Sequence, residues 1–491
     1  MHVQVAIVGA GFGGLAAAIA LRKAGVDDLV ILERADDLGG VWRENTYPGA
    51  ACDIPSCLYS FSYDQRRSWS RPCSTQDEIL DYLHTTADRH GLRAKVRTGT
   101  EVTTATFDPA AARWTLETSA GEPVTAQAIV LACGQLTRPL FPAVDGRASF
   151  AGPSFHSAEW DHSVELRGKR IAVVGTGASA IQFVPEIAKV AARVDVYQRT
   201  APWILPRRNK PYAPWARRAI ERVPGLQHAR RLGILAFAES GIASQTRVPL
   251  IRRAIGAWAT WHMKNQVKDP ALRAKVWPDY PIGCKRVLFS SHYLPALTRP
   301  NVDLVTDRIA RITPGGVVTE DGTEREVDVV IYGTGFRAHD FVAPMRVLGR
   351  DGRELSDAWR DGARAHLGIT VGGFPNLFLM YGPNTNLGFG SIIVMLEAQA
   401  RYVASAIRTL RSTGPAAALD VRPEVEERTT TRVQERLRDT VWTDCESWYR
   451  EGADGRIVNN WPGQMAEYVR ATREIDLTEY DLAREPAGVS A

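Results

Sequence analysis

The sequence predicts an α/β fold built on two copies of one strand–turn–helix unit. The first observation is a short apolar strand, a glycine-rich turn and an apolar helical pattern at residues 3–21. The second is the recurrence of this order at residues 170–190. The third is a charged residue 24 positions after the first glycine of each unit (9 to 33 and 175 to 199), which is Glu33 in one copy and Arg199 in the other. The length of 491 residues, too great for a single core, agrees with two such parts.

Each glycine turn is typical of a dinucleotide-binding unit, in which backbone N–H groups at a helix N-terminus hold a pyrophosphate. The residues expected to do so are Gly9, Gly11 and Gly14 in the first unit, and Gly175, Gly177 and Ser179 in the second. Glu33 can accept hydrogen bonds from ribose hydroxyls but would repel a 2′-phosphate, whereas Arg199, with Thr200 beside it, would attract one. The first unit therefore predicts an FAD site and the second an NADPH site. The alternative is two purely structural glycine turns.

The segment that joins the two units has an uncommon spacing of aromatic, glycine and histidine residues. It reads Phe150-x-Gly152-x-x-x-His156-x-x-x-Trp160-Asp161. This pattern resembles the fingerprint of the type I Baeyer–Villiger monooxygenases, and the chain is similar to that family from end to end. The resemblance implies two Rossmann-like domains, one for FAD and one for NADP. We expect His156 and Trp160 to pack and position the linker rather than to take part in the chemistry.

The order of these features predicts three segments and one insertion. Residues 1–145 are expected to form the first part of an FAD-binding domain, residues 150–337 an NADP-binding domain, and residues 338–491 the second part of the FAD-binding domain. A helical insertion is expected within the NADP-binding domain at about 205–280. The tail after about residue 484 is rich in Ala, Gly and Pro and is expected to fray.

A loop rich in glycine and proline follows the first unit and is expected to approach the flavin. It contains Gly40 and Trp42 and continues as Tyr47-Pro-Gly-Ala-Ala51-Cys-Asp53. The loop resembles the family's YPGxRxD segment, which implies that Asp53 orients a catalytic arginine. Ala51 departs from that pattern, because many members of the family carry Arg there. The alternative role for Asp53 is an Asx cap within the turn.

The insertion is expected to close at Gly283-Cys-Lys285-Arg286, where two cations are adjacent. On an extended backbone neighbouring side chains point in opposite directions, so one can face a phosphate and the other the flavin. The segment resembles the one in which the family carries a lysine for the NADP phosphate and then a catalytic arginine. This implies a phosphate contact for Lys285 and catalysis for Arg286. Ordinary surface charges are the alternative.

A further cofactor element is expected in the C-terminal third of the chain. A strand at 378–381, a Gly/Asn loop at 382–388 and a long helix at 391–411 follow one another. A helix N-terminus suits the pyrimidine end of a flavin, whose carbonyl gains negative charge on reduction. Asn384 and Leu387 are therefore predicted to lie at the cofactor, although simple apolar packing explains Leu387 equally well.

Composition excludes several classes of protein. With 45% hydrophobic and 23% charged residues the chain is of ordinary globular type, and no apolar run reaches the length of a membrane span. No nucleic-acid recognition module is visible. The six cysteines show neither a paired framework nor a metal-ligand spacing. We therefore expect no structural disulfide, no metal site, and a cytoplasmic location.

The insertion holds most of the positive charge. Residues 201–286 contain 17 Lys and Arg against 4 Asp and Glu, although the whole chain carries only +5. Helical patterns at 213–223 and 250–261 place apolar residues on one side and arginines on the other. Either the apolar sides pack on the domain and leave a solvated basic face, or the helices contact a membrane surface or an anionic carrier. The resemblance implies that the insertion forms part of the substrate entrance.

The resemblance implies a flavin monooxygenase that consumes NADPH and dioxygen. A flavin peroxide would convert a hydrophobic ketone to an ester or lactone, with Arg286 stabilising negative charge and Asp53 orienting Arg286. Three other functions are open: oxygenation of sulfur or nitrogen, disulfide reduction by the CxxxxC pair Cys52 and Cys57, and NADPH sensing without catalysis. The two cofactor sites and the fingerprint favour the Baeyer–Villiger reaction.

Overall fold

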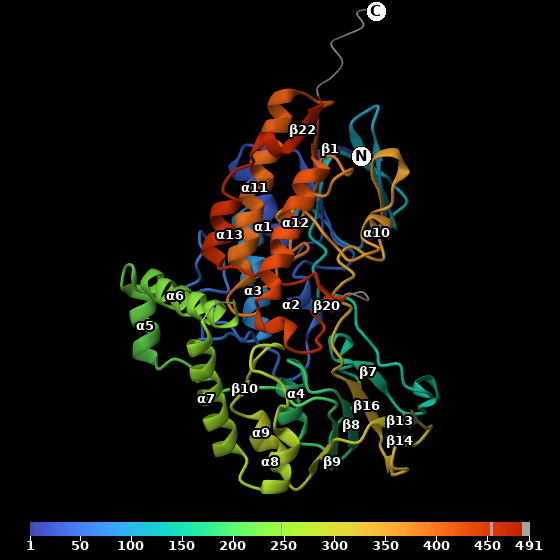
Figure 1. Ribbon diagram of the computed structural model, residues 1–491, viewed down its shortest axis with the longest axis vertical. Helices are drawn as coiled ribbons and strands as arrows, with labels where there is room; N and C mark the ends of the chain where they lie inside the picture. The colour runs from blue at the N-terminus through green and yellow to red at the C-terminus, as the bar shows by residue number, and fades with distance from the viewer. Residues whose placement is uncertain (247, 452–454, 484–491) are drawn as a thin grey trace, which may run out of the picture.

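The computed structural model describes residues 1–246, 248–451 and 455–483, so the tail that was expected to fray lies outside the described residues (Figure 1). Its larger sheet has eight strands, and the pairs β1–β2 and β1–β6 at its centre are parallel. Across the sheet the strands follow the order β17 (Arg346–Leu348), β4 (Val102–Asp108), β5 (Arg113–Thr118), β6 (Val124–Leu131), β1 (His2–Val8), β2 (Leu29–Leu32) and β3 (Val96–Arg97), and β18 (Leu377–Leu379) also pairs with β6. The sheet thus joins strands from both ends of the chain.

The smaller sheet has five strands, and every pairing in it is parallel. In order they are β12 (Val302–Val305), β9 (Arg193–Tyr197), β8 (Arg170–Val174), β16 (Val329–Tyr332) and β7 (Ser154–His156). The four residues of β16 pair in register with residues 171–174 of β8. Because β8 lies between β9 and β16, its carboxyl end is the point where a dinucleotide is held in this class of fold. The predicted strand at 170–174 is confirmed.

Helices cover both sheets. Those packed with the larger sheet are α1 (Phe12–Lys23), α2 (Val41–Glu44), α3 (Gln76–Arg89), α10 (Leu355–Ala358), α11 (Ile392–Thr413), α12 (Pro423–Arg438) and α13 (Met465–Ala471). Helix α1 lies against α11, and their apolar residues form the main core with β1 (Figure 1). The smaller sheet carries α4 (Ala180–Ile187) and α9 (Tyr293–Leu297). Helix α4 is shorter than the periodicity to residue 190 predicted, because the chain turns after Ile187.

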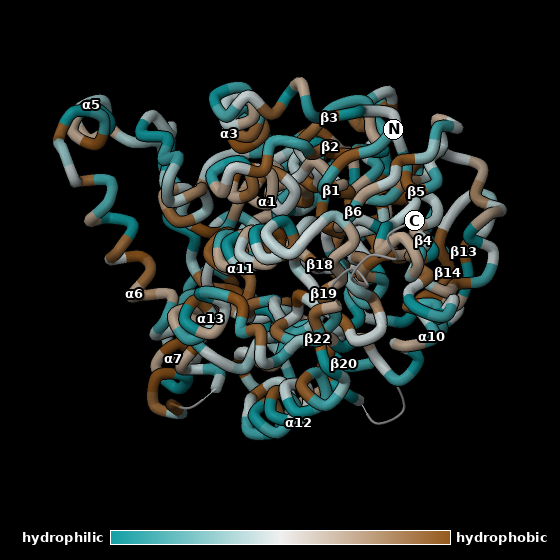
Figure 2. Tube along the Cα trace, turned by 90° about the horizontal axis from the view of Figure 1, so that it is seen from above, coloured by the Kyte–Doolittle hydropathy of each residue, from teal (hydrophilic) through white to brown (hydrophobic). Residues whose placement is uncertain are grey.

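The insertion consists of four helices: α5 (Pro214–Arg222), α6 (Leu226–Thr246), α7 (Pro249–Gln266) and α8 (Pro270–Val276). Strand β10 (Ile204–Leu205) precedes them and pairs with β11 (Leu288–Phe289) after them. Because β10 and β11 pair, the insertion begins and ends at the same place, and the Lys285-Arg286 segment lies at its base. Helices α5, α6 and α7 project from one side of the molecule in both views (Figures 1 and 2).

The outer apolar residues of the insertion do not pack on the domain as the amphipathic pattern suggested. Trp215, Leu250 and Trp261 are exposed, whereas the packed side of α7 carries Ala259, His262 and Met263. Burial is decided by neighbouring elements, and the body of the protein covers only one side of α6 and α7. Of the two alternatives for the insertion, the one in which the apolar sides pack on the domain is therefore corrected for these three residues.

The remaining strands form small sheets at the edges. They are β13 (Ile309–Ile312), β14 (Gly316–Thr319) and β15 (Glu324–Glu326), then β19 (Ala418–Val421) with β22 (Tyr480–Ala483), and β20 (Arg450–Glu451) with β21 (Arg456–Ile457). None of the helices in the described residues combines the length and the apolar character that crossing a membrane requires. The α/β prediction, with two parallel-sheet units and a helical insertion, is confirmed.

Candidate active site between the two units

The first glycine turn connects β1 to α1 and leaves no room for a Cβ at Gly9 or Gly14. Gly9 has a φ of +102°, and a Cβ there would lie 2.5 Å from the carbonyl oxygen of Ala132. A Cβ on Gly14 would lie 1.9 Å from the Gly9 oxygen. Gly11 immediately precedes α1 and lies close to Gly40, whose own φ is +54°. The turn is therefore a bare backbone surface at a helix N-terminus, which suits a pyrophosphate.

Glu33 lies at the end of β2 and is held in place by the backbone. Its side chain is only 7% exposed. One carboxylate oxygen accepts a hydrogen bond from the N–H of Ala10 at 2.8 Å, and the other from the N–H of Ala35 at 3.0 Å. The carboxylate also lines the cavity described below. The carboxylate is thus held toward the cavity in one orientation.

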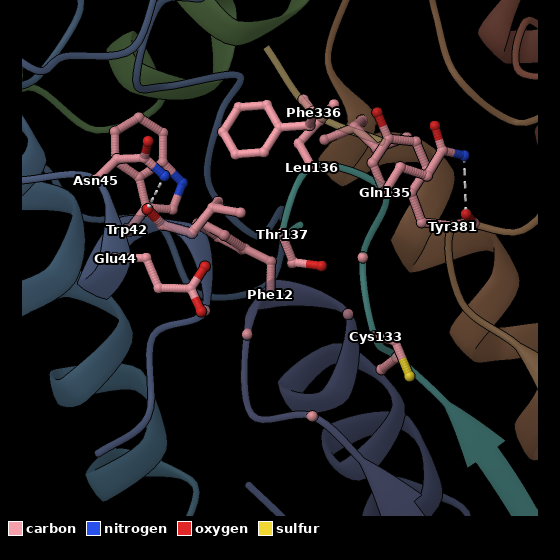
Figure 3. A pocket seen from close by; sticks show the side chains of 18 of the residues that line it. Phe12, Trp42, Glu44, Asn45, Cys133, Gln135, Leu136, Thr137, Phe336 and Tyr381 are labelled. Atoms are coloured by element: carbon pink, nitrogen blue, oxygen red, sulfur yellow. Dashed lines mark hydrogen bonds between the residues drawn. The ribbon is translucent and has the colours of Figure 1, made fainter. Parts of the chain in front are cut away.

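One cavity of about 420 Å³ runs along the first turn and reaches the second. Nine of the predicted site residues line it: Gly9, Gly11, Glu33, Gly40, Trp42, Asp53, Ser179, Arg286 and Leu387. Figure 3 shows Trp42, Glu44 and Asn45 on one side of the cavity and Gln135, Phe336 and Tyr381 on the other. The Gln135 amide donates a hydrogen bond of 3.0 Å to the Tyr381 carbonyl (Figure 3). The Trp42 indole N–H donates one of 3.2 Å to the Tyr59 hydroxyl. Residues 233 positions apart, such as Asp53 and Arg286, share this space.

Asp53 and Arg286 form an ion pair inside the cavity. A terminal guanidinium nitrogen of Arg286 donates to Asp53 Oδ2 at 2.8 Å. Burial would raise the pKa of Asp53, but the charges of Arg286 and Arg207 outweigh it, so the pKa of Asp53 lies below its ordinary value. The charge of Asp53 raises the pKa of Arg286 in turn. The Arg286 side chain remains 39% exposed toward the cavity, so it is both charged and accessible.

Two residues of this site were missed by sequence reasoning. The Arg207 guanidinium donates to the Cys52 carbonyl, which precedes Asp53, so a second cation reaches the loop where Ala51 has none. Gln182 of α4 donates its amide to the Ala51 carbonyl at 2.9 Å and accepts from the Ala51 N–H at 3.2 Å. A polar residue among the apolar residues of the first turns of α4 was the available signal for Gln182. No local signal pointed to Arg207.

The second glycine turn, after β8, repeats the first in its backbone. Gly175 has a φ of +105°, and a Cβ there would lie 2.5 Å from the Gly333 oxygen. Gly177 is exposed, and the carbonyl of Thr200 accepts a hydrogen bond from Thr176 at 3.2 Å. Arg199 is also exposed, two residues beyond the end of β9. Except for Ala178 and Ser179, the residues of this turn lie outside the cavity wall.

Lys285 lies close enough to Arg199 for the two charges to interact. Burial lowers the pKa of the Lys285 ammonium, and the charge of Arg199 lowers it further. The ammonium sits over the Tyr280 ring, 4.7 Å from its centre. Two cations that repel each other at the mouth of the second unit are an arrangement that an anion would stabilise.

Asn384 and Leu387 are placed differently from each other. Leu387 borders the cavity. Asn384 has a φ of +54° and uses its amide to donate to the carbonyls of Ile457 at 2.8 Å and Asn460 at 3.0 Å. Its side chain thus fastens the loop to the C-terminal segment, away from the cavity wall.

The fingerprint residues pack at the junction of the two sheets. His156 is buried between the rings of Phe141 and Phe336, at 5.6 and 5.5 Å, and burial lowers its pKa to about 4. Trp160 contacts Phe155 and Phe183. Gly152 is required because a Cβ would lie 2.6 Å from the Asp328 oxygen, with the Phe150 ring 2.9 Å away. Asp161 caps a turn by accepting from Ser163 N–H and Oγ.

The expectation of no structural disulfide is wrong. Cys284 and Cys445 are joined across a sequence separation of 161, with Cα atoms 6.1 Å apart. Cys284 is fully buried immediately before Lys285 and Arg286, so the bond ties this segment to the C-terminal part of the chain. Sequence spacing could not reveal the pair, because only the fold brings two such distant residues together.

The CxxxxC pair does not have the properties of a redox centre. Cys52 and Cys57 are buried free thiols, and burial raises the pKa of each. A thiol with a raised pKa provides little thiolate for disulfide exchange. The pair therefore lacks the reactive thiolate that the disulfide-reductase alternative requires.

Comparison with known proteins adds a sequence relationship to this geometry. The family model described as pyridine nucleotide-disulphide oxidoreductase matches residues 6–229. A Baeyer–Villiger monooxygenase of Streptomyces coelicolor is 45% identical over 100% of this chain and 95% of its own length, and one of Pseudomonas aeruginosa is 42% identical over 99% and 92%. Among solved structures, OTEMO in complex with FAD and NADP superposes with a TM-score of 0.88 at 26% identity, covering 98% of this chain and 99% of that one.

Proposed function

The chain belongs to the Baeyer–Villiger monooxygenase family, and from this premise we propose that it uses NADPH and dioxygen to convert a hydrophobic ketone to an ester or lactone. The observation that carries the proposal is the Asp53–Arg286 ion pair of 2.8 Å, which faces a cavity bordered by both glycine turns. Asp53 follows the first unit in the sequence and Arg286 follows the second. The charged centre is thus assembled only where the two units meet.

FAD fits the first unit. The bare backbone of Gly9, Gly11 and Gly14 suits the pyrophosphate, and the fixed Glu33 carboxylate suits the ribose hydroxyls. Once reduced by NADPH, the bound flavin supplies the activation of dioxygen. Leu387, Phe289 and Phe389 line the same cavity and favour an apolar substrate there. These apolar walls also exclude water from the reacting groups.

Arg286 is proposed to hold the negative charge that develops on oxygen when the ketone carbonyl is attacked. Its guanidinium is always charged and has several donors, so it can keep the bond to Asp53 and offer another N–H to the oxyanion. Asp53 limits the orientations of the guanidinium, and the charge of Arg286, supported by that of Arg207, lowers the pKa of Asp53. Asp53 and Arg207 are positioning residues in this proposal.

NADPH is proposed to bind at the second unit. Gly175, Gly177 and Ser179 would hold its pyrophosphate, while Arg199, Thr200 and Lys285 would hold its 2′-phosphate. The mutual repulsion of Arg199 and Lys285 supports this role, because a phosphate relieves it. The chain division at 1–145, 150–337 and 338–491 is proposed on the same basis, since the five-stranded sheet uses only residues between 154 and 332.

The cytoplasm is the proposed location. Four of the six cysteines are free thiols, in agreement with a reducing compartment, and Cys284–Cys445 is the exception. The proposed partners are the apolar substrate and dioxygen, with an anionic surface or carrier at the basic insertion.

Replacement of Arg286 tests the proposed reaction. Arg286→Ala should retain bound FAD and NADPH oxidation, while ester formation from a ketone panel falls about 100- to 1000-fold, because one preorganised charge at the oxyanion is lost. The consumed dioxygen should appear as hydrogen peroxide. Mass spectrometry of the products and a peroxide assay measure both. Asp53→Asn should show a milder form of this uncoupling, since the arginine keeps its charge but loses its orientation.

The control is the FAD content of each variant, which separates chemistry from folding. An Arg286→Ala variant that makes ester at the wild-type rate would remove the basis of the proposal. Sulfoxide formation from a thioether, with no ester from any ketone, would instead support heteroatom oxygenation.

A further inference from the structure

Helices α5, α6 and α7 carry several exposed apolar side chains on the surface of the protein. This outer face consists of Trp215, Val223, Leu232, Phe237, Leu250, Trp258 and Trp261. Trp215 is 75% exposed, Leu250 74%, Trp261 62% and Phe237 58%. Leu250, Trp258 and Trp261 recur at helical spacing and form a stripe along α7. In Figure 2 α5 and the adjoining part of α6 stand apart from the body of the molecule, and α7 lies at its edge.

Helix α6 buries polar residues as well as the apolar Ala238 and Ile242. Its polar residues Gln227, Arg231 and Gln245 are buried against the body of the protein. The Arg231 guanidinium donates to the carbonyls of Cys57 at 2.8 Å and Ser60 at 2.9 Å. Its apolar residues Leu232 and Phe237 face outward instead. A helix that hides charge and exposes hydrophobic residues is arranged for an apolar contact outside its own chain.

The outer face is flanked by cations that have few anionic neighbours. Exposed basic residues on and beside the three helices are Arg217, Arg218, Arg222, Arg253, Lys264 and Lys268. Between residues 213 and 268 the only acidic residues are Glu221 and Glu239. Glu221 pairs with Arg217 at 3.0 Å, and Glu239 accepts the N–H of Ala466 at 2.9 Å. The positive charge of this face is therefore largely uncompensated.

We infer that the outer face of α5, α6 and α7 docks on an anionic lipid surface. Exposed Trp and Leu side chains flanked by Arg and Lys are the combination that binds at a lipid headgroup boundary. A second copy of the chain is a poorer occupant, because a two-fold contact would bring the same positive charges together. Helices that project from the body can contact a deformable lipid surface, whereas a peptide partner would need a preformed groove.

The face is connected to the catalytic cavity through aromatic rings. Phe237 of α6 contacts Phe389 with ring centres 5.9 Å apart, and Phe389 contacts Phe289 at 6.0 Å. Phe389 and Phe289 line the cavity. Gly241 lets α6 approach this point, since a Cβ there would lie 2.3 Å from the Phe389 ring. On the basis of the proposed function, an apolar ketone dissolved in the lipid would have a short apolar path from the docked face to the site.

Flotation of the full-length holoenzyme with vesicles tests the docking. Vesicles of phosphatidylglycerol and phosphatidylcholine should retain the protein at low ionic strength, and vesicles of phosphatidylcholine alone should retain much less. Leu250→Ala with Trp261→Ala should weaken the partition coefficient by about tenfold or more, because two exposed apolar groups are lost. Arg218→Gln and Arg253→Gln should each weaken it by about fivefold.

A matched control replaces the same residue types elsewhere. Leu477 and Arg360 are also exposed but do not belong to the insertion, so Leu477→Ala with Arg360→Gln should leave vesicle binding unchanged. Failure of the wild-type protein to bind anionic vesicles overturns the inference. So does binding that the Leu250/Trp261 variant retains in full, or a dimer in analytical ultracentrifugation that this variant dissolves. The binding assay contains no ketone or NADPH, so its result is independent of the proposed reaction.

Discussion

The glycine turn after β1 and the glycine turn after β8 share a backbone but differ in their surroundings. Gly9 and Gly175 have φ values of +102° and +105°, and each excludes a Cβ through a carbonyl 2.5 Å away. The first turn is enclosed, and its acidic residue Glu33 is buried and bonded to two backbone N–H groups. The second is open, and its basic residue Arg199 is exposed. An enclosed site favours retention of a bound molecule, whereas an open site favours its exchange.

Substitution at the sixth position of each turn should reveal the largest difference in stability and FAD content between the two units. Gly14 stands there in the first unit, and Ala180 in the second. Gly14→Ala places a Cβ 1.9 Å from the Gly9 oxygen, so we expect about 3 kcal/mol or more of destabilisation and loss of FAD. Ala180→Gly should cost about 1 kcal/mol and keep FAD. Flavin absorbance per chain and thermal unfolding measure both, and a Gly14→Ala protein with full flavin content would contradict the prediction.

The disulfide should matter mainly for the segment that follows the second unit. Cys445→Ser opens a loop with a sequence separation of 161, so we expect a loss of about 2–4 kcal/mol in the free energy of unfolding. Because the Lys285-Arg286 segment is then less restrained, the Cys445→Ser variant should also form less ester per NADPH consumed. Reductant should reproduce the change in the wild-type protein and have no effect on Cys445→Ser. If reductant leaves the wild-type stability unaltered, the bond does not contribute.

Acid should loosen the junction between the units through His156. Its pKa is about 4 in the folded protein, below the ordinary value of about 6.5, so the unfolded chain binds the proton more tightly. The stability that His156 contributes is present above about pH 6.5 and is lost as the pH falls toward 4, by up to about 3 kcal/mol. His156→Phe should flatten this acid slope in denaturant titrations. Part of the slope should persist, because the pKa of buried His366 is also about 4. Identical slopes in variant and wild type would contradict the assignment.

Replacement of Arg199 or Lys285, the basic pair of the second unit, should produce the smallest of these effects, on the choice between NADPH and NADH. Arg199→Ala or Lys285→Ala should weaken NADPH binding by about 1–3 kcal/mol and leave NADH nearly unchanged. Because Arg199 lowers the pKa of Lys285, NADPH binding should weaken as the pH rises through that pKa, and Arg199→Ala should move this transition to higher pH. Calorimetric titrations measure the affinities. Arg167→Ala, an exposed arginine of the same unit, is the control, and equal losses for NADPH and NADH would refute the assignment.

The sequence by itself determined the two turns, the strands that lead into them and the charges at Glu33 and Arg199. These features depend on glycine backbone freedom and on spacing along the chain, which act over short separations. Only the tertiary structure decided that Arg207 and Gln182 support the Asp53 loop, that Asn384 faces away from the cavity, and that Cys284 meets Cys445. It also decided that Trp215 and Trp261 stay uncovered. Such contacts join residues tens to hundreds of positions apart, and a local pattern of hydrophobicity records which side chains are apolar but not which neighbours will cover them.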